Sequence, residues 1–477
     1  ELSGFKSNTD QQEGFWNAIR RQINTHDLDD TERLCAIALI KRLFPHMIEE
    51  ATGARFSDEQ RFWPSTAFLA AVPWLKQVDQ NSEWKNKAQI HLQQALQCGY
   101  SESERHAASA VAIPWATADG PIWFSSAIRR DEPGGTGTNK ERKPVVEQLL
   151  KSLCNASKDP RSAAEQTKAP VPYYALLLMD GDDMGRLGQT LGEPGKLSEC
   201  LGDFSSKVEG VVREQDGRTI YAGGDDVMAI LPAANVLDAA ETLRSEYQNA
   251  FALKNVSAEA ATISAAIVYA HWKYPLRLVL QTAHQLLDNV AKDQTGRDSI
   301  AIASIFGSGL NAVWSVPWDV YHGTIADGKS QSVALTSILH RFESADLENA
   351  VDPPFNASFL YLLRERFGGL LNDVRDQPGL YAKFAPDDDT KTSDLLLDLA
   401  HSEYRRRMKD KARQQTDREI TKERIEELMS LSRRWTRRSH GEGQRVIQCE
   451  RNTFSFDGWR IARLIKQIQD GKVNDND

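Results

Sequence analysis

Two acidic motifs are the part of the sequence best suited to catalysis. The first contains Asp180, which follows an apolar run, and the second is the pair Asp225 and Asp226, which follows two glycines. Carboxylates are costly to place beside apolar backbone unless a cation neutralises them, and hard divalent cations take oxygen ligands. We therefore expect Asp180, Asp225 and Asp226 to be both the catalytic residues and the ligands of one or two Mg²⁺ or Mn²⁺ ions.

The chemistry that such a site predicts is nucleotidyl transfer. Divalent ions bind a triphosphate and lower the pKa of an attacking hydroxyl, and glycines let the backbone pass close to a phosphate. Lys292 and Arg297 offer positive charge to phosphate oxygens, although a lysine at a helix end also complements the helix dipole without any ligand. The predicted nucleotide contacts are Gly181, Asp182, Asp183, Gly223, Gly224, Ser264, Lys292 and Arg297.

The elements around the motifs predict a sheet that brings them together. Apolar runs typical of buried strands cover 173–180, 219–222, 227–231, 261–269 and 299–305, with helical patterns between them at 196–213, 234–252 and 276–292. This order, β-α-β-β-α-β with an added α-β, is that of a ferredoxin-like palm. In such a sheet the first strand lies beside the hairpin, so Asp180 and Asp225 can face one another. A single acidic turn is often only solvated, but two at the ends of neighbouring strands favour a site.

The regions on either side of the palm read as helical. We expect an α+β chain with a mainly helical domain at 1–170, the palm with its Gly-Gly-Asp-Asp hairpin at 171–310, and a C-terminal helical domain at 311–477. A polar stretch that ends in two prolines precedes the first strand and marks the first boundary. The segment 404–438 is rich in arginine, and it is either a solvated helical face or a contact for RNA or protein.

Composition limits the class of protein. The chain has 477 residues and a net charge of -9, so any contact with nucleic acid must come from local patches or from partner subunits. Five cysteines occur without a CxxC pair, which favours a reducing, cytoplasmic setting over a disulfide framework. No apolar run approaches the roughly 18 residues that a membrane span needs, and the N-terminus lacks the pattern of a signal peptide.

With both motifs in view, the chain resembles the large polymerase-cyclase subunit of type III CRISPR effector complexes, and more narrowly that of the type III-B, or Cmr, branch. Asp180 to Gly185 and Gly223 to Asp226 resemble the second palm domain of that family. The flanks also resemble it: its middle helical domain at Glu32 to Cys35, Lys41 to Pro45 and Trp63 to Trp74, and the end of its C-terminal helical domain at Phe454 to Arg460.

The resemblance implies a signalling subunit that assembles with other Cas subunits, guide RNA and target RNA. Relatives convert ATP to cyclic oligoadenylates once target RNA is bound, and some type III-B members instead join ATP to S-adenosylmethionine. ATP is therefore the expected substrate, and S-adenosylmethionine is the alternative co-substrate.

Two departures from the family pattern change what we expect. Many relatives bind zinc through a CxxC pair in the middle helical domain, whereas here Cys35 is followed at the third position by Ala38, so zinc is not expected. Relatives also usually begin with an HD nuclease domain and a first palm, and neither precedes the helical region of this sequence. Cleavage of single-stranded DNA by an HD site is therefore not expected.

Two other functions fit parts of the sequence. Diguanylate cyclases share the palm, but their motif requires an acidic residue and a phenylalanine after the first aspartate, and here Val227 follows Asp226. A catalytically silent scaffold subunit is the other alternative, and the intact carboxylates argue against it.

Overall fold

The computed structural model describes most of the chain from Trp63 onward. It covers 63–98, 120–130, 138–155, 169–192, 194–257, 259–324, 333–340, 357–367, 389–408, 417–440, 444–450 and 455–471, with a few shorter stretches elsewhere. The chain divides by packing into two compact units, Glu1–Trp63 and Pro64–Asp477. The zinc prediction at Cys35 and Ala38 lies outside the described residues.

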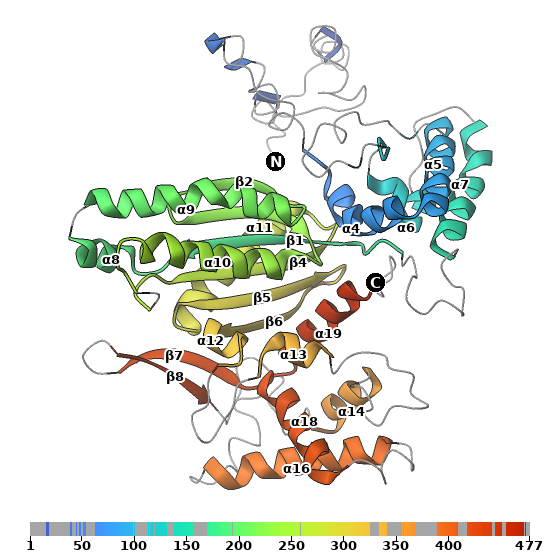
Figure 1. Ribbon diagram of the computed structural model, residues 1–477. Coiled ribbons are helices and arrows are strands. Elements are labelled where there is room, and N and C mark those ends of the chain that lie inside the picture. The colour runs from blue at the N-terminus through green and yellow to red at the C-terminus, as the bar shows by residue number, and fades with distance from the viewer. Residues whose placement is uncertain are drawn as a thin grey trace, which may run out of the picture. The chain divides into compact units, whose positions relative to one another are not determined.

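A six-stranded sheet forms the centre of the second unit (Figure 1). Its strand order is β2-β3-β1-β4-β5-β6, antiparallel throughout except for the parallel pair β4 and β5. The first four strands in this order reproduce the ferredoxin-like arrangement, so the predicted palm is confirmed. The strand bounds are β1 Tyr173–Gly181, β2 Arg218–Gly223, β3 Asp226–Pro232, β4 Ile263–His271, β5 Ser299–Phe306 and β6 Gly309–Pro317.

Alternation along β1 gives the sheet two buried faces. Tyr173, Leu177 and Met179 belong to one hydrophobic core, whereas Tyr174 and Leu178 belong to another. A strand that is buried on both faces must be apolar at nearly every position, which explains why β1 reads as a continuous apolar run. Asp180 is the first side chain of β1 that escapes this burial, because the strand ends there.

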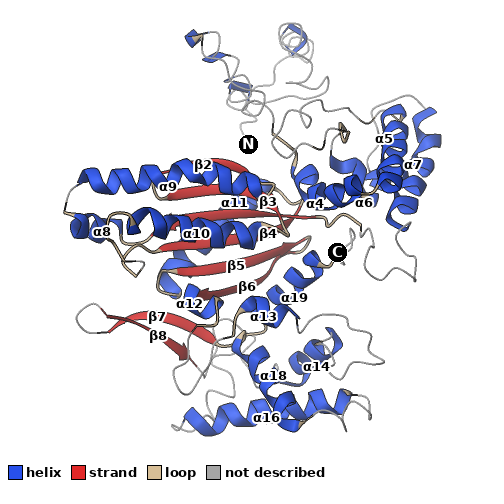
Figure 2. Ribbon diagram, viewed as in Figure 1, coloured by secondary structure: helices blue, strands red, loops and turns tan. Residues whose placement is uncertain are grey.

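Helices cover both faces (Figure 2). The first core includes residues of α9 and α10, and the second includes residues of the N-terminal helices, of α11 and of the π-helical η3 that continues it. The helix bounds on this part of the chain are α4 Thr66–Gln80, α5 Ser82–Gln97, η2 Gly120–Trp123, α6 Ser125–Arg130, α7 Thr138–Asn155, α8 Met184–Leu191, α9 Pro194–Glu214, α10 Val236–Ala252, α11 Leu276–Gln285 and η3 Leu286–Gln294.

The N-terminal helices and the sheet form one packing unit rather than two. Thr66, on α4, donates a hydrogen bond to the carbonyl of Trp272 just after β4, at 3.1 Å. Lys76, on the same helix, pairs with Asp216 just before β2. The compact unit therefore begins at Pro64, while the predicted boundary near residue 170 divides a shared core. The division into three domains stays a prediction.

The C-terminal region is less purely helical than predicted. β6 extends the sheet to Pro317, beyond the expected end of the palm at residue 310. Arg434–His440 and Gln444–Glu450 form the antiparallel hairpin β7–β8, which corrects the helical interpretation of this stretch. The other elements here are α12 Trp318–Tyr321, α13 Leu335–His340, α14 Ala357–Phe367, α16 Asp389–Arg407, α18 Arg418–Ser430 and α19 Asp457–Gln469.

Strand propensity and the burial of one tryptophan account for the hairpin. Trp435 is buried, as expected of a strand that packs one face on a core, and β-branched Val446 and Ile447 lie on the partner strand. Arg437 and Arg438 are consecutive, so their side chains leave opposite faces of the strand: Arg437 is 12% exposed and Arg438 is 61% exposed. None of the described helices is both long enough and apolar enough to cross a membrane.

Candidate active site

The two acidic motifs meet at one end of the sheet. Met179 of β1 is paired with Val227 of β3, so the next positions outward are Asp180 on one strand and Asp226 on the other. Asp225 occupies the hairpin tip beside Gly181, where an added Cβ would fall 2.8 Å from the Cβ of Asp225 and 2.7 Å from the hydroxyl of Tyr247. A glycine at 181 therefore makes room for Asp225, which is a steric reason distinct from the phosphate approach expected from sequence.

Asp180 has a counter-ion in the structure. Its Oδ2 pairs with Nζ of Lys292, which extends from η3 on the face of the sheet that also buries Leu178. Burial, reinforced by the charge of Arg297, lowers the pKa of Lys292 to about 8. The structure thus places the predicted phosphate-binding lysine within the carboxylate site.

Asp225 is the half-buried carboxylate of the hairpin. Burial, together with the charge of Asp226 beside it, raises the pKa of Asp225. Asp226 itself is exposed. Gly224, in the turn between β2 and β3, has a φ of 67°, a left-handed conformation that glycine adopts without strain.

Asp182 points into the protein. Its Oδ1 accepts a hydrogen bond from Ser264 Oγ at 2.8 Å, and its Oδ2 accepts one from the backbone N–H of Asp298 at 2.9 Å. Burial raises the pKa of Asp182 to about 6 despite these donors. Asp182 and Ser264, both expected to contact nucleotide, therefore hold the end of β1 against β4 and the loop before β5.

Asp298 was not anticipated from sequence. Its carboxylate is almost fully buried and pairs with Arg244 of α10 at 3.2 Å and with Arg437 of β7 at 2.8 Å. The loop that carries it has three successive residues with positive φ, namely Gly296, Arg297 and Asp298. The sequence signal here was Gly296 followed by the charged residues Arg297 and Asp298 at the start of a strand. This pattern is too common to predict that Asp298 is buried and paired with two arginines.

Asp183 joins the site to the C-terminal hairpin. Its Oδ1 lies 3.2 Å from Nε of Arg297, and its Oδ2 pairs with Nη2 of Arg445 on β8. Arg437 and Arg445, with Arg186 of α8, also line a cavity of about 730 Å³ beside this edge. Arg445 could not be found by sequence spacing, because 262 positions separate it from Asp183.

The carboxylates at this edge of the sheet are the type of ligand that a divalent cation prefers. Within the described ranges, no three His, Cys, Asp or Glu side chains lie close enough together to hold a metal ion. However, burial and then the charge of Asp226 raise the pKa of Asp225, so a hard cation would find two carboxylates that gain from neutralisation. The donor type at this edge therefore suits Mg²⁺ or Mn²⁺, and Asp180, Asp225 and Asp226 remain the predicted ligands.

A family model coincides with the sheet that carries these residues. Residues 173–301 match the model described as Cas10/Cmr2, second palm domain. This part of the chain is similar to the second palm domain of Cas10/Cmr2. The matched range begins at the first residue of β1 and includes both acidic motifs, Ser264, Lys292 and the loop of Asp298. The predicted resemblance to the type III-B polymerase-cyclase family is thereby confirmed.

Similarity to Cmr2 extends beyond this palm. The chain is 29% identical over 322 residues to the CRISPR system Cmr subunit Cmr2 of Pyrococcus furiosus, a match that covers 61% of this chain and 34% of that protein. The chain thus spans about a third of the length of this curated relative.

Two solved structures also match. The type III-B Cmr-beta complex in its apo state matches with a TM-score of 0.43 and 13% identity, over 80% of this chain and 48% of the other. The same complex bound to cognate target RNA matches with a TM-score of 0.42 and 14% identity, over 84% of this chain and 49% of the other.

Proposed function

We propose that this chain is the signalling subunit of an RNA-guided type III CRISPR complex and makes cyclic oligoadenylate from ATP when target RNA is bound. The observation that carries the proposal is the meeting of Asp180, Asp225 and Asp226 at one end of a Cas10/Cmr2 palm, beside Lys292. Similarity to Cmr2 supports the proposed partners, which are other Cas subunits, guide RNA and target RNA.

The proposed reaction is displacement at the α-phosphorus of ATP. The oxygen of a ribose hydroxyl forms the new ester bond to the α-phosphorus and its proton passes to water, while the bond from the α-phosphorus to the bridging oxygen breaks and pyrophosphate leaves. Asp180, Asp225 and Asp226 would hold Mg²⁺ or Mn²⁺, which supplies neutralisation of phosphate charge and activation of the hydroxyl. Lys292 binds a triphosphate oxygen, and in doing so it exchanges Asp180 for a phosphate partner.

The positioning of this site comes from the protein. Gly181 leaves space for Asp225 beside β1, and Asp182 fastens the strand end through Ser264 and the loop of Asp298. Catalysis of phosphoryl transfer depends mostly on positioning and charge neutralisation. The reaction therefore requires a strand end that keeps the carboxylates in fixed positions.

The test uses the assembled complex with target RNA and labelled ATP, in the presence of Mn²⁺. We expect the double variant Asp225→Ala, Asp226→Ala to lose product by a factor of about 100 or more, because both carboxylates that face the phosphates are removed. The matched control is Glu209→Ala, on the solvent side of α9, where the Glu209 side chain is 71% exposed. Chromatography and mass spectrometry of the product provide the measurement.

Each outcome of this assay decides between the alternatives. Cyclic oligoadenylate that the double variant fails to make supports the proposal. A product that appears only after S-adenosylmethionine is added identifies the conjugating synthase instead. A complex that binds target RNA but forms no nucleotide product, with or without S-adenosylmethionine, shows a scaffold subunit, and the catalytic proposal is then wrong.

A further inference from the structure

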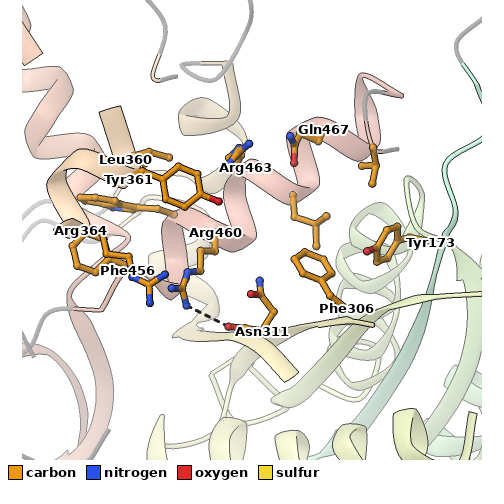
Figure 3. A pocket seen from close by; sticks show the side chains of 13 residues that line it. Tyr173, Phe306, Asn311, Leu360, Tyr361, Arg364, Phe456, Arg460, Arg463 and Gln467 are labelled. Atoms are coloured by element: carbon orange, nitrogen blue, oxygen red, sulfur yellow. Dashed lines mark hydrogen bonds between the residues drawn. The ribbon is translucent and has the colours of Figure 1, made fainter. Parts of the chain in front are cut away.

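A second cavity lies beside Tyr173 and Phe306, at the end of the sheet where β1 begins and β5 ends (Figure 3). It has a volume of about 570 Å³, within the range of roughly 300–1,000 Å³ that small-molecule sites occupy. Its walls come from the start of β1 and the end of β5 on one side, and from α14 and α19 on the other. Tyr173 begins β1 and Phe306 ends β5, whereas Asp180 lies at the far end of β1.

The charge of this cleft is one-sided. Arg364 of α14 and Arg460 and Arg463 of α19 line it, and none of the described lining residues is aspartate or glutamate. Because the whole chain has a net charge of -9, three arginines around one cavity are a local departure from the rest of the molecule. One of the three, Arg460, pairs with Asp457, and the remaining excess of guanidinium groups favours a phosphate-bearing ligand.

The arginines are held in place rather than spread over the surface. Nη1 of Arg460 donates to the carbonyl of Asn311 at 3.3 Å and pairs with Asp457 at 3.1 Å. Arg463 lies over the ring of Tyr361, with its guanidinium carbon 5.8 Å from the ring centroid. Such preorganisation lowers the entropy cost of binding an anion.

Aromatic surface completes the cleft. Tyr361 is 61% exposed, which is unusual for so large a ring, and Phe306 is partly exposed at the other wall. Phe456 and Trp459 are buried below them and form the apolar floor. An exposed aromatic ring next to arginines is the combination on which nucleic-acid bases stack while their phosphates are bound.

We infer that this cleft binds a nucleoside phosphate, with the base against Tyr361 or Phe306 and the phosphate on the arginines of α14 and α19. The ligand is a free nucleotide or one nucleotide of a single-stranded RNA, since both present the same base and phosphate. This inference does not rest on the proposed function, because the cleft and the carboxylates occupy opposite ends of the strands.

The experiment measures binding to the full chain in EDTA, so that the carboxylate site contributes no metal-dependent affinity. The probes are ATP, AMP and a short single-stranded RNA. Calorimetry measures the affinity of the nucleotides, and fluorescence anisotropy measures that of the RNA. We expect Tyr361→Ala and Arg463→Ala each to weaken binding about tenfold, because each removes a stacking or a charge-assisted contact. Both side chains are at least partly exposed, so the fold should tolerate their removal.

The control variant is Lys466→Ala. Lys466 is on the same helix as Arg463, pairs with Asp470 at 3.0 Å and lies outside the cleft, so its removal should leave binding unchanged. Glu209→Ala, the exposed control on α9, should also bind as the parent chain does.

Photocrosslinking with a nucleotide that carries a reactive base gives a readout independent of the variants. We expect the label on the peptide that contains Tyr361 or on the one that contains Phe306. Tight binding by AMP and ATP identifies the free nucleotide as the ligand, and binding by RNA alone identifies the strand. The inference is wrong if neither probe binds, if Lys466→Ala weakens binding as much as Arg463→Ala, or if the label falls elsewhere.

Discussion

Asp298 is the residue on which the edge of the site depends. Its carboxylate is 6% exposed and pairs with Arg244 and Arg437, while its backbone N–H donates to Asp182. One residue therefore ties the end of β1, a helix of the palm and the C-terminal hairpin together. Removing one partner from a buried ion pair is costly, because the remaining charge is left without compensation.

Asp298→Asn should for this reason lower the free energy of unfolding by about 3 kcal/mol. Asn keeps the size of the side chain and the backbone donor to Asp182, so the change is confined to the charge. The control is Asp319→Asn, which also removes a partner of Arg437, but from a side chain that is 39% exposed. We expect that variant to lose about 1 kcal/mol or less.

Urea unfolding followed by circular dichroism measures both variants. Equal losses for Asp298→Asn and Asp319→Asn would contradict the assignment of Asp298 as the buried hub. A loss of nucleotidyl transfer in Asp298→Asn alone, under conditions where that variant remains folded, would show that the hub also sets the geometry of the carboxylates.

At the scale of elements, the hairpin β7–β8 packs against the loop before β5 and contacts Asp183 at the edge of the site. The backbone N–H of Arg437 donates to the carbonyl of Thr295 at 2.7 Å, and Arg445 reaches Asp183 from the second strand. Gly296 permits this approach, because a Cβ there would fall 1.9 Å from the carbonyl oxygen of Arg437. The φ of Gly296 is 98°, which also favours glycine.

Gly296→Ala should therefore separate β7 from the loop before β5. We expect faster hydrogen exchange at the amide of Arg437 and a fall in product formation, since Arg297 and Asp298 belong to the displaced loop. Gly307→Ala is the matched control, because an added Cβ at Gly307 meets nothing within 4 Å. Unchanged exchange at Arg437 in the Gly296 variant would show that the hairpin does not depend on this contact.

The palm was predictable because its strands are buried on both faces and joined by strong turn signals. Predicted and observed strands agree to within about two residues, which is the usual uncertainty of element ends. β6 was missed because it follows a glycine-rich turn and because Asn311 and Ser315 interrupt its apolar run. β7 was predicted to be helical because its arginines resembled the solvated face of a helix, and a single tryptophan, Trp435, is a weak strand signal.

The residues of the candidate site could be predicted where a short sequence motif or a helix end marks them. Asp180, Asp225 and Asp226 follow from motif and strand order, and Lys292 from its place at a helix end. The inward turn of Asp182 toward Ser264 could not be foreseen, because it depends on which oxygen donors surround a buried carboxylate. Arg445 could not be foreseen either, because its contact is made across most of the fold.

For the unit as a whole, one buried histidine links stability to pH. His91 of α5 is fully buried, with Nδ1 3.2 Å from the carbonyl of Val146 and Nε2 2.9 Å from that of Ile122. A neutral imidazole donates through one nitrogen only, and protonation would satisfy both carbonyls. Burial nevertheless dominates and lowers the pKa of His91 below its ordinary value of 6.5.

The sign of the effect follows from this direction. Below pH 6.5 the unfolded chain binds a proton at His91 before the folded chain does, so stability present above 6.5 is lost as the pH falls through the folded pKa. We expect the free energy of unfolding to fall between pH 7 and 5, and to fall less steeply in His91→Gln, which cannot titrate. Parallel pH profiles for the two proteins would contradict the prediction.

The pairing of the hairpin with the palm also has a consequence for synthesis on the ribosome. All six strands of the sheet are complete once Pro317 has emerged, but Arg437 follows Asp319 by 118 positions. At about 5–20 residues per second, translation of that interval takes roughly 6–24 seconds. During this time the nascent palm has its carboxylates, Lys292, Arg244 and Arg297, but it lacks Arg437 and Arg445, the second partners of Asp298 and Asp183.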